Sequence, residues 1–90
     1  MTRNITIPTV HMNGTAYKDL FEPARAAMDA IRAADKALIE MTPNGRDYYP
    51  QGDSAFTNAR QQHEQRRQAL RNMLSELEDL AIGIQDQGRR

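Results

Sequence analysis

The chain contains no cysteine, and this absence narrows the ways in which so short a protein can be stabilised. A domain of 90 residues buries a modest fraction of its surface, so small domains often add disulfides, a structural metal or a partner chain. Without cysteine there is neither a disulfide nor a thiolate metal site. The two histidines, His11 and His63, are far apart in sequence and match no metal-ligand spacing. We therefore expect no cofactor, and we expect a homo-oligomer to supply the missing stability.

A charge excess of one sign and long apolar runs are also missing. Twelve basic residues balance twelve acidic ones, whereas a general nucleic-acid-binding protein needs a net basic face, so nucleic acid is a disfavoured partner. No stretch approaches the ~20 apolar residues of a membrane span. The N-terminal segment also lacks the apolar core of a signal peptide. We expect a soluble, cytoplasmic protein with no membrane partner.

Catalytic motifs are absent as well. His63-Glu64 begins like the helix of a zinc protease, but Arg67 stands where that motif needs its second histidine. The sequence has no phosphate-binding glycine loop, no dinucleotide-binding motif and no nucleophile elbow. Asp35 and His63 resemble part of a catalytic triad, but no nucleophile is evident beside them. We therefore predict that the protein is not an enzyme and acts by binding.

The sequence does contain two apolar stripes in which the steps alternate between three and four residues, as on one face of a helix. They predict a first helix over residues 15–42 and a second over residues 55–85, joined by a loop over residues 43–54. Two long helices with such a connection fold back on each other. The expected fold is therefore all-α, an antiparallel two-helix hairpin packed into a homo-oligomeric helical bundle.

The ends of these helices carry recognisable signals. Thr15 or Asp19 is expected to cap the first helix, and Asp53 or Ser54 the second. Pro23 is expected to bend the first helix because it lacks a backbone donor. Residues 1–14 alternate apolar and polar side chains around a proline, which predicts a short extended arm. Residues 86–90 form a polar tail.

The first half of the second stripe does not consist of apolar residues alone, as a core would. The positions that should face the first helix there include His63 and Arg66. In a hairpin folded about the loop tyrosines, His63 faces the level of Asp35, and Arg66 faces the level of Ile31. An Asp, a His and an Arg then meet near the loop. Three interpretations remain open at this point: a buried polar layer that fixes the register, a solvated face, or a ligand pocket shared with the loop. The full predicted stripe is Phe56, Ala59, His63, Arg66, Leu70, Met73, Leu77, Leu80 and Ile84.

The loop adds two adjacent tyrosines and an arginine, which a simple connection does not need. A tyrosine ring stacks on a base and a guanidinium grips a phosphate, so the combination suits a planar anionic ligand. Alternatively, the tyrosines close the open end of the hairpin and Arg46 pairs with Asp47. The candidate ligand site comprises Arg46, Asp47, Tyr48, Tyr49, His63, Arg66 and Arg67.

Two segments carry a resemblance to known proteins, VHMNGT at residues 10–15 and PNGRDYYPQG at residues 43–52. Together they resemble small helical proteins of tailed bacteriophages and prophages, and the helices match these in length and pattern. The resemblance implies a viral, bacteriophage origin and a compact helical hairpin, but it carries no assigned activity. Pro23 departs from the pattern.

Small phage proteins of this kind include inhibitors of host defence proteins, proteins that sequester a nucleotide signal, and virion-assembly proteins. We therefore expect a phage-encoded, non-enzymatic binding protein in the host cytoplasm. Its expected role is anti-defence, by sequestering a cyclic-nucleotide or ADP-ribose-like signal. The alternative is a protein-interaction or virion-assembly module that binds a host or phage protein and no small molecule.

Overall fold

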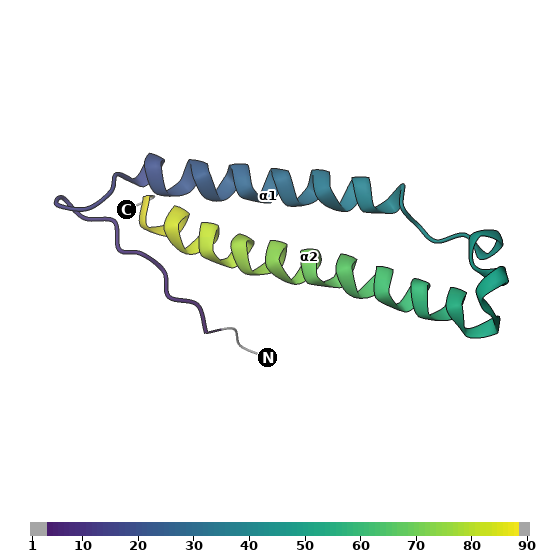
Figure 1. Cartoon of the computed structure of the whole chain (residues 1–90). Coiled ribbons are helices and arrows are strands. Elements are labelled where there is room, and N and C mark those ends of the chain that lie inside the picture. The colour runs from purple at the N-terminus through teal and green to yellow at the C-terminus, as the bar shows by residue number, and fades with distance from the viewer. Residues whose placement is uncertain (1–3, 89–90) are drawn as a thin grey trace.

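The computed structural model describes residues 4–88, which form two antiparallel helices joined at one end (Figure 1). Helix α1 spans Tyr17–Ile39 and helix α2 spans Asp53–Gly88. Two single-turn 3-10 helices, η1 (Gly45–Asp47) and η2 (Tyr49–Gln51), form the connection, and residues 4–88 contain no strand. The molecule is elongated, with extents of 62 × 26 × 18 Å. The all-α helical hairpin is thus confirmed; the first three arm residues and the last two tail residues lie outside the described part.

Helix α1 begins later than the sequence signals indicate. Its N-cap is Ala16, whose side chain makes no capping bond, so the predicted Thr15 cap is wrong. Asp19 lies in the first turn, where a carboxylate favourably faces the positive end of the helix dipole. The predicted Asp19 cap is therefore wrong too, because Asp19 lies inside the helix. Helix α1 continues through Pro23, which lacks the N–H that would bond to the carbonyl of Asp19.

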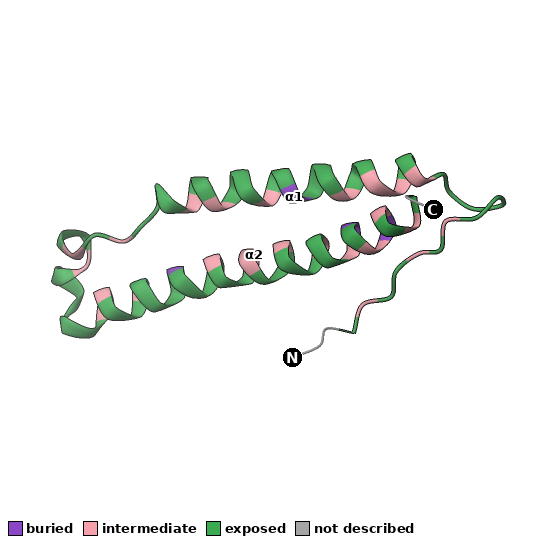
Figure 2. Cartoon of the chain, turned by 180° about the vertical axis from the view of Figure 1, so that it is seen from behind, coloured by how far each residue is buried: buried purple, intermediate pink, exposed green. Residues whose placement is uncertain are grey.

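The apolar core lies toward the terminal end of the hairpin. Ile84 is 2% exposed, and Ala81 and Met28 are the other buried apolar residues among those described. The Tyr17 ring stacks on Phe21 at 5.6 Å between centroids and closes this end. Nearer the loop, the one buried side chain is polar, that of His63 (Figure 2). Hydrophobic burial therefore holds the helices together at one end of the molecule and gives little at the other.

The face that α2 turns toward α1 differs from the predicted stripe at two positions. Arg66 and Met73 are exposed, whereas Arg67 and Leu74 are partly buried against α1. Both patterns alternate steps of three and four residues, so periodicity alone does not separate them. In the observed register, Arg67 faces Asp35 on α1 and donates a hydrogen bond to its carboxylate.

The N-terminal arm returns along the C-terminal end of α2 (Figure 1). The Gln87 side chain accepts a hydrogen bond from the Val10 N–H at 2.8 Å and donates one to the Pro8 carbonyl at 2.9 Å. The Ile7 side chain occupies the space that any Cβ at Gly83 would need. The side-chain amide of Gln87 thus satisfies backbone groups of the arm as a neighbouring strand would.

Replacing Gln87 with Ala should release the arm from α2. The loss of both bonds leaves a partly buried N–H and carbonyl without partners, and we expect unfolding to become easier by about 1 kcal/mol. Hydrogen exchange at the Val10 amide should accelerate while amides in the middle of α1 keep their protection. The exposed Gln65→Ala is the matched control, and unchanged exchange at Val10 in Gln87→Ala would contradict this account of the arm.

Candidate functional site

The ion pair between Asp35 and Arg67 lies between the helices at the polar end of the hairpin. Arg67 donates from Nε to Oδ1 of Asp35 at 2.8 Å and from Nη2 to Oδ2 at 3.2 Å. The two side chains are about one-quarter exposed, at 26% for Asp35 and 27% for Arg67. The hydrogen bonds from Arg67 lower the pKa of the Asp35 carboxyl against the opposing effect of partial burial. The same bonds raise the pKa of the Arg67 guanidinium.

His63 lies one helical turn from Arg67 and is 6% exposed. Its Nε2 atom is buried and has no hydrogen-bond partner. Buried polar atoms in native proteins nearly always have a partner, because an unpartnered one costs its full desolvation energy. His63 is therefore the one side chain in the interior of the described structure with a buried polar atom that lacks a hydrogen-bond partner.

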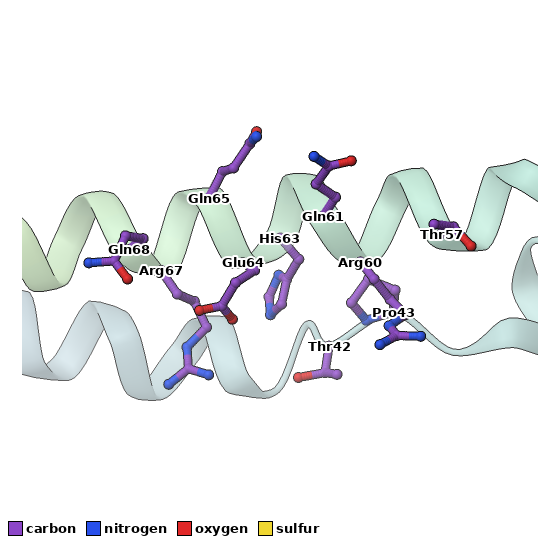
Figure 3. Close-up of a pocket in the computed structure, with 10 residues that line it drawn as sticks. All are labelled: Thr42, Pro43, Thr57, Arg60, Gln61, His63, Glu64, Gln65, Arg67 and Gln68. Atoms are coloured by element: carbon purple, nitrogen blue, oxygen red, sulfur yellow. The ribbon is translucent and has the colours of Figure 1, made fainter.

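An open groove of about 750 Å³ lies beside His63 on one side of the hairpin (Figure 3). Arg60 and Arg67 flank His63 along it, at steps of three and four residues, so the three share one stripe of α2. The Arg60 guanidinium lies over the Phe56 ring, 5.5 Å from its centroid. Glu64 also lines the groove, and its carboxylate accepts a hydrogen bond from Arg71.

The cation at Arg60 differs from the others in this groove. Arg67 is paired with Asp35, whereas no carboxylate within residues 4–88 pairs with Arg60. The groove also offers the hydroxyls of Thr42 and Thr57 and the amide of Gln68, while the side chains of Gln61 and Gln65 point away from α1 in Figure 3. Hydroxyls, an amide and an uncompensated guanidinium are groups that bind phosphate or carboxylate. We call it the His63 groove; its lining is Thr42, Pro43, Thr57, Arg60, Gln61, His63, Glu64, Gln65, Arg67 and Gln68.

A second groove, of about 650 Å³, lies on the opposite side of the hairpin near the loop. Tyr48, Arg66 and Met41 line it, together with Gln62 and the other face of His63. No carboxylate contributes to this lining. His63 therefore separates two grooves of different character.

The seven predicted site residues do not form one cluster. His63 and Arg67 line the His63 groove, whereas Tyr48 and Arg66 line the second groove. The Tyr48 ring lies 6.4 Å from that of Phe56 and closes the hairpin, whereas Tyr49 is 76% exposed and the ion pairs within residues 4–88 do not include one between Arg46 and Asp47. The other three predicted site residues line neither groove: Arg46, Asp47 and Tyr49.

Sequence reasoning missed Arg60 as a site residue. The missed signal is the stripe Arg60, His63 and Arg67, in which two cations flank a histidine on one helical face. The predicted stripe runs through Arg66 instead, which belongs to the other side of α2.

No protein-family model, curated protein or solved structure matches this chain. Within residues 4–88, no group of three or more His, Asp or Glu side chains is arranged to hold a metal ion. None of the helices described is long and apolar enough to cross a membrane. The site must therefore be interpreted from its own geometry.

The lowered pKa of Asp35 predicts a dependence of stability on pH. A carboxyl with a depressed pKa in the folded state stabilises the protein above its ordinary pKa of about 3.9, and loses this effect as the pH falls through the folded-state value. Asp35→Asn should therefore unfold at lower urea concentration than the parent protein at pH 7. The two midpoints should converge as the pH falls below about 4. The control is Asp29→Asn, which removes an exposed pair; a gap that is constant from pH 7 to pH 2 would refute the interpretation.

Replacing His63 with Leu should stabilise the protein. The change removes a buried unpartnered nitrogen and adds apolar surface at the helix interface, so the free energy of unfolding should rise by about 1 to 3 kcal/mol. Chemical denaturation of both proteins without ligand measures the difference. A lower stability of His63→Leu would mean that His63 is a structural residue whose hydrogen bonding is already complete.

Proposed function

We propose that this protein is a non-enzymatic binding protein whose ligand carries a phosphate and lies in the His63 groove. The observation that carries the proposal is the buried Nε2 atom of His63, which has no partner, between Arg60 and Arg67. This nitrogen is buried, so a ligand in the groove would reach it by a rotation of the imidazole and would then supply the missing hydrogen-bond partner. Natural proteins accept a stability cost of this kind mainly where function requires it.

The charges of the groove support an anion of low total charge. Asp35 compensates Arg67 and Glu64 compensates Arg71, so Arg60 supplies the net positive charge. The flat guanidinium of Arg60, which lies over the Phe56 ring, also offers a face on which a planar base can stack. A nucleotide combines both of these features, since it carries a phosphate and a planar base.

The lack of an evident nucleophile in the groove supports binding without catalysis. The hydroxyls that line it belong to Thr42 and Thr57, and the Thr42 hydroxyl donates to the Ile39 carbonyl at 2.6 Å. Neither threonine has a hydrogen bond to His63, whose Nε2 has no partner. A general base activates a nucleophile through such a hydrogen bond.

In biological terms, we propose a bacteriophage protein that acts in the host cytoplasm and counters host immunity. It would hold a cyclic-nucleotide or ADP-ribose-like signal and so lower the free concentration that reaches host effectors. The segments at residues 10–15 and 43–52, which resemble phage proteins, support the viral origin. The hairpin form and the His63 groove support sequestration, because a small rigid protein made in quantity needs only affinity for this task.

A second candidate function is a protein-interaction or virion-assembly module. The observation in its favour is the exposure of large side chains around the loop: Tyr49 is 76% exposed and Met41 64%. Exposed tyrosine and methionine are enriched in protein interfaces. In this case the partner is a host or phage protein that docks on the loop, and the His63 groove stays empty of nucleotide.

The experiment is a thermal-shift and calorimetric titration of the protein with cyclic di- and trinucleotides and ADP-ribose derivatives. A ligand that binds only the folded state raises the melting temperature with concentration. Arg60→Ala should weaken binding by about 10- to 100-fold, because a charge-assisted hydrogen bond is worth about 1.5 to 3 kcal/mol. The matched control is Arg25→Ala, which removes an exposed arginine far from the groove.

The variant His63→Leu separates the site from the fold. We expect this variant to be more stable than the parent protein and to bind the same ligand much more weakly. No shift with any nucleotide at millimolar concentration would refute the nucleotide proposal. Capture of one partner protein by the parent, lost in Tyr49→Ala, would then establish the interaction module.

A further inference from the structure

Helix α1 has two sides of opposite character flanking the face that contacts α2. One stripe, at steps of three and four residues, is almost entirely charged and comprises Lys18, Glu22, Arg25, Asp29, Arg32 and Lys36. The stripe on the other flank has no charged residue at all and comprises Leu20, Pro23, Ala27, Ala34 and Leu38, followed by Met41. A helix on the surface of a lone hairpin has no need for an uncharged flank, because solvent favours polar side chains on both.

Helix α2 repeats this division, and its sides match those of α1. Arg32 of α1 and Arg71 of α2 line the same depression, so the charged stripes of both helices share one side. Met41 lines the second groove with Ala55 and Gln62, so the uncharged stripe of α1 and the stripe of α2 that contains Ala55 and Gln62 share the other side. We call the latter the apolar side; its members in α2 are Ala55, Gln62, Arg66, Ala69, Met73, Glu76 and Leu80.

The apolar side of α2 carries one cation and one anion, Arg66 and Glu76. Both are exposed, and neither has an ion-pair partner within residues 4–88. The intrahelical and interhelical ion pairs of the described structure involve other residues on the charged side or at the helix interface. The apolar side therefore contains two opposite charges that form no ion pair within residues 4–88.

We infer that the apolar side binds a second copy of this chain, in a two-fold symmetric dimer with each helix antiparallel to its counterpart. A two-fold axis at the level of Arg71 sets Arg66 against Glu76 of the partner subunit, and Glu76 against the partner's Arg66. The same axis brings Met73 onto the small side chain of the partner's Ala69. Such a self-complementary contact is what two-fold symmetry requires.

Helix α1 gives the same axis independently. Ile31 of α1 and Arg71 of α2 lie at the same height along the hairpin, since both residues line one depression. An axis half a residue away from Ile31 pairs each uncharged side chain of this stripe with another uncharged side chain. The pairs are Leu20 with Met41 of the partner subunit, Pro23 with Leu38 of the partner subunit, and Ala27 with Ala34 of the partner subunit. The alanine pair permits close approach of the two α1 helices at the centre.

The surface area of the chain supports a partner of this size. One chain exposes 7006 Å², whereas a compact monomer of 10.2 kDa exposes about 5,300 Å². The excess of about 1,700 Å² on one chain is more than the about 800 Å² that each partner buries in a stable interface of standard size. A dimer through the apolar side forms a four-helix bundle, the arrangement that gives each long helix two neighbours.

The dimer also explains the second groove. In the antiparallel arrangement the arm of one chain, docked on Gly83 and Gln87, comes to lie beside the second groove of its partner. Apolar arm side chains such as Ile5 and Val10 then fill space that is open in one chain. The His63 groove lies on the charged side and stays accessible, so this inference does not depend on the proposed function.

Sedimentation equilibrium of the full chain, without ligand, tests the dimer. We expect a monomer–dimer equilibrium, and Met73→Glu should make the protein monomeric at all concentrations, because it replaces the apolar contact with the partner's Ala69 by a buried carboxylate. Met73 is 53% exposed in one chain, so its replacement leaves the hairpin folded. The control is Met12→Glu at the 98% exposed tip of the arm, which should dimerise as the parent does.

A charge-exchange experiment tests the register. Arg66→Glu and Glu76→Arg should each weaken self-association by about tenfold, since each places like charges together at two symmetric contacts. An equimolar mixture of the two variants should dimerise as tightly as the parent, because every contact then joins opposite charges. A monomer at all concentrations, a dimeric Met73→Glu, or a mixture no tighter than the separate variants would overturn the proposal. Circular dichroism of each variant confirms that the helices are intact.

Discussion

The ion pair between Asp35 and Arg67 is the contact on which the arrangement of the loop end depends. It joins the helices at a level where apolar contacts are sparse, and its two parallel hydrogen bonds allow little freedom in how the helices face each other. With Arg67 turned inward, His63 follows into the interior and Arg60 into the same groove, while Arg66 is left on the far side. A single side-chain pair thus decides which cations belong to the candidate site.

The hairpin separates stability from recognition along its length. Ile84 and Ala81 pack at the terminal end, where the Tyr17 and Phe21 rings stack. Polar groups at the loop end contribute little to hydrophobic burial, and one of them, the Nε2 atom of His63, carries a cost. Functional groups are better tolerated where the structure has another source of rigidity, and the apolar end of the hairpin supplies it.

The sequence allowed the hairpin to be predicted because its information is periodic and redundant. Each helix repeats its stripe over many turns, so an error at one position does not change the fold. The site depends instead on single positions: whether Arg66 or Arg67 turns inward follows from a partner on another helix, which no local pattern encodes. The first helix shows the same limit, since Thr15 has a capping side chain but Ala16 occupies the N-cap position. Capping is decided by the path of the arm as it enters the helix.

The docking of the arm has a consequence for the order of events during synthesis. Gln87 bonds to backbone groups 77 and 79 residues earlier in the chain. Contacts of such separation form late, because the intervening chain must be ordered before its ends can meet. On the ribosome, the arm therefore cannot dock until α2 has left the exit tunnel and packed against α1. The arm is made before both helices but docks after them, and until then its apolar side chains are available to chaperones.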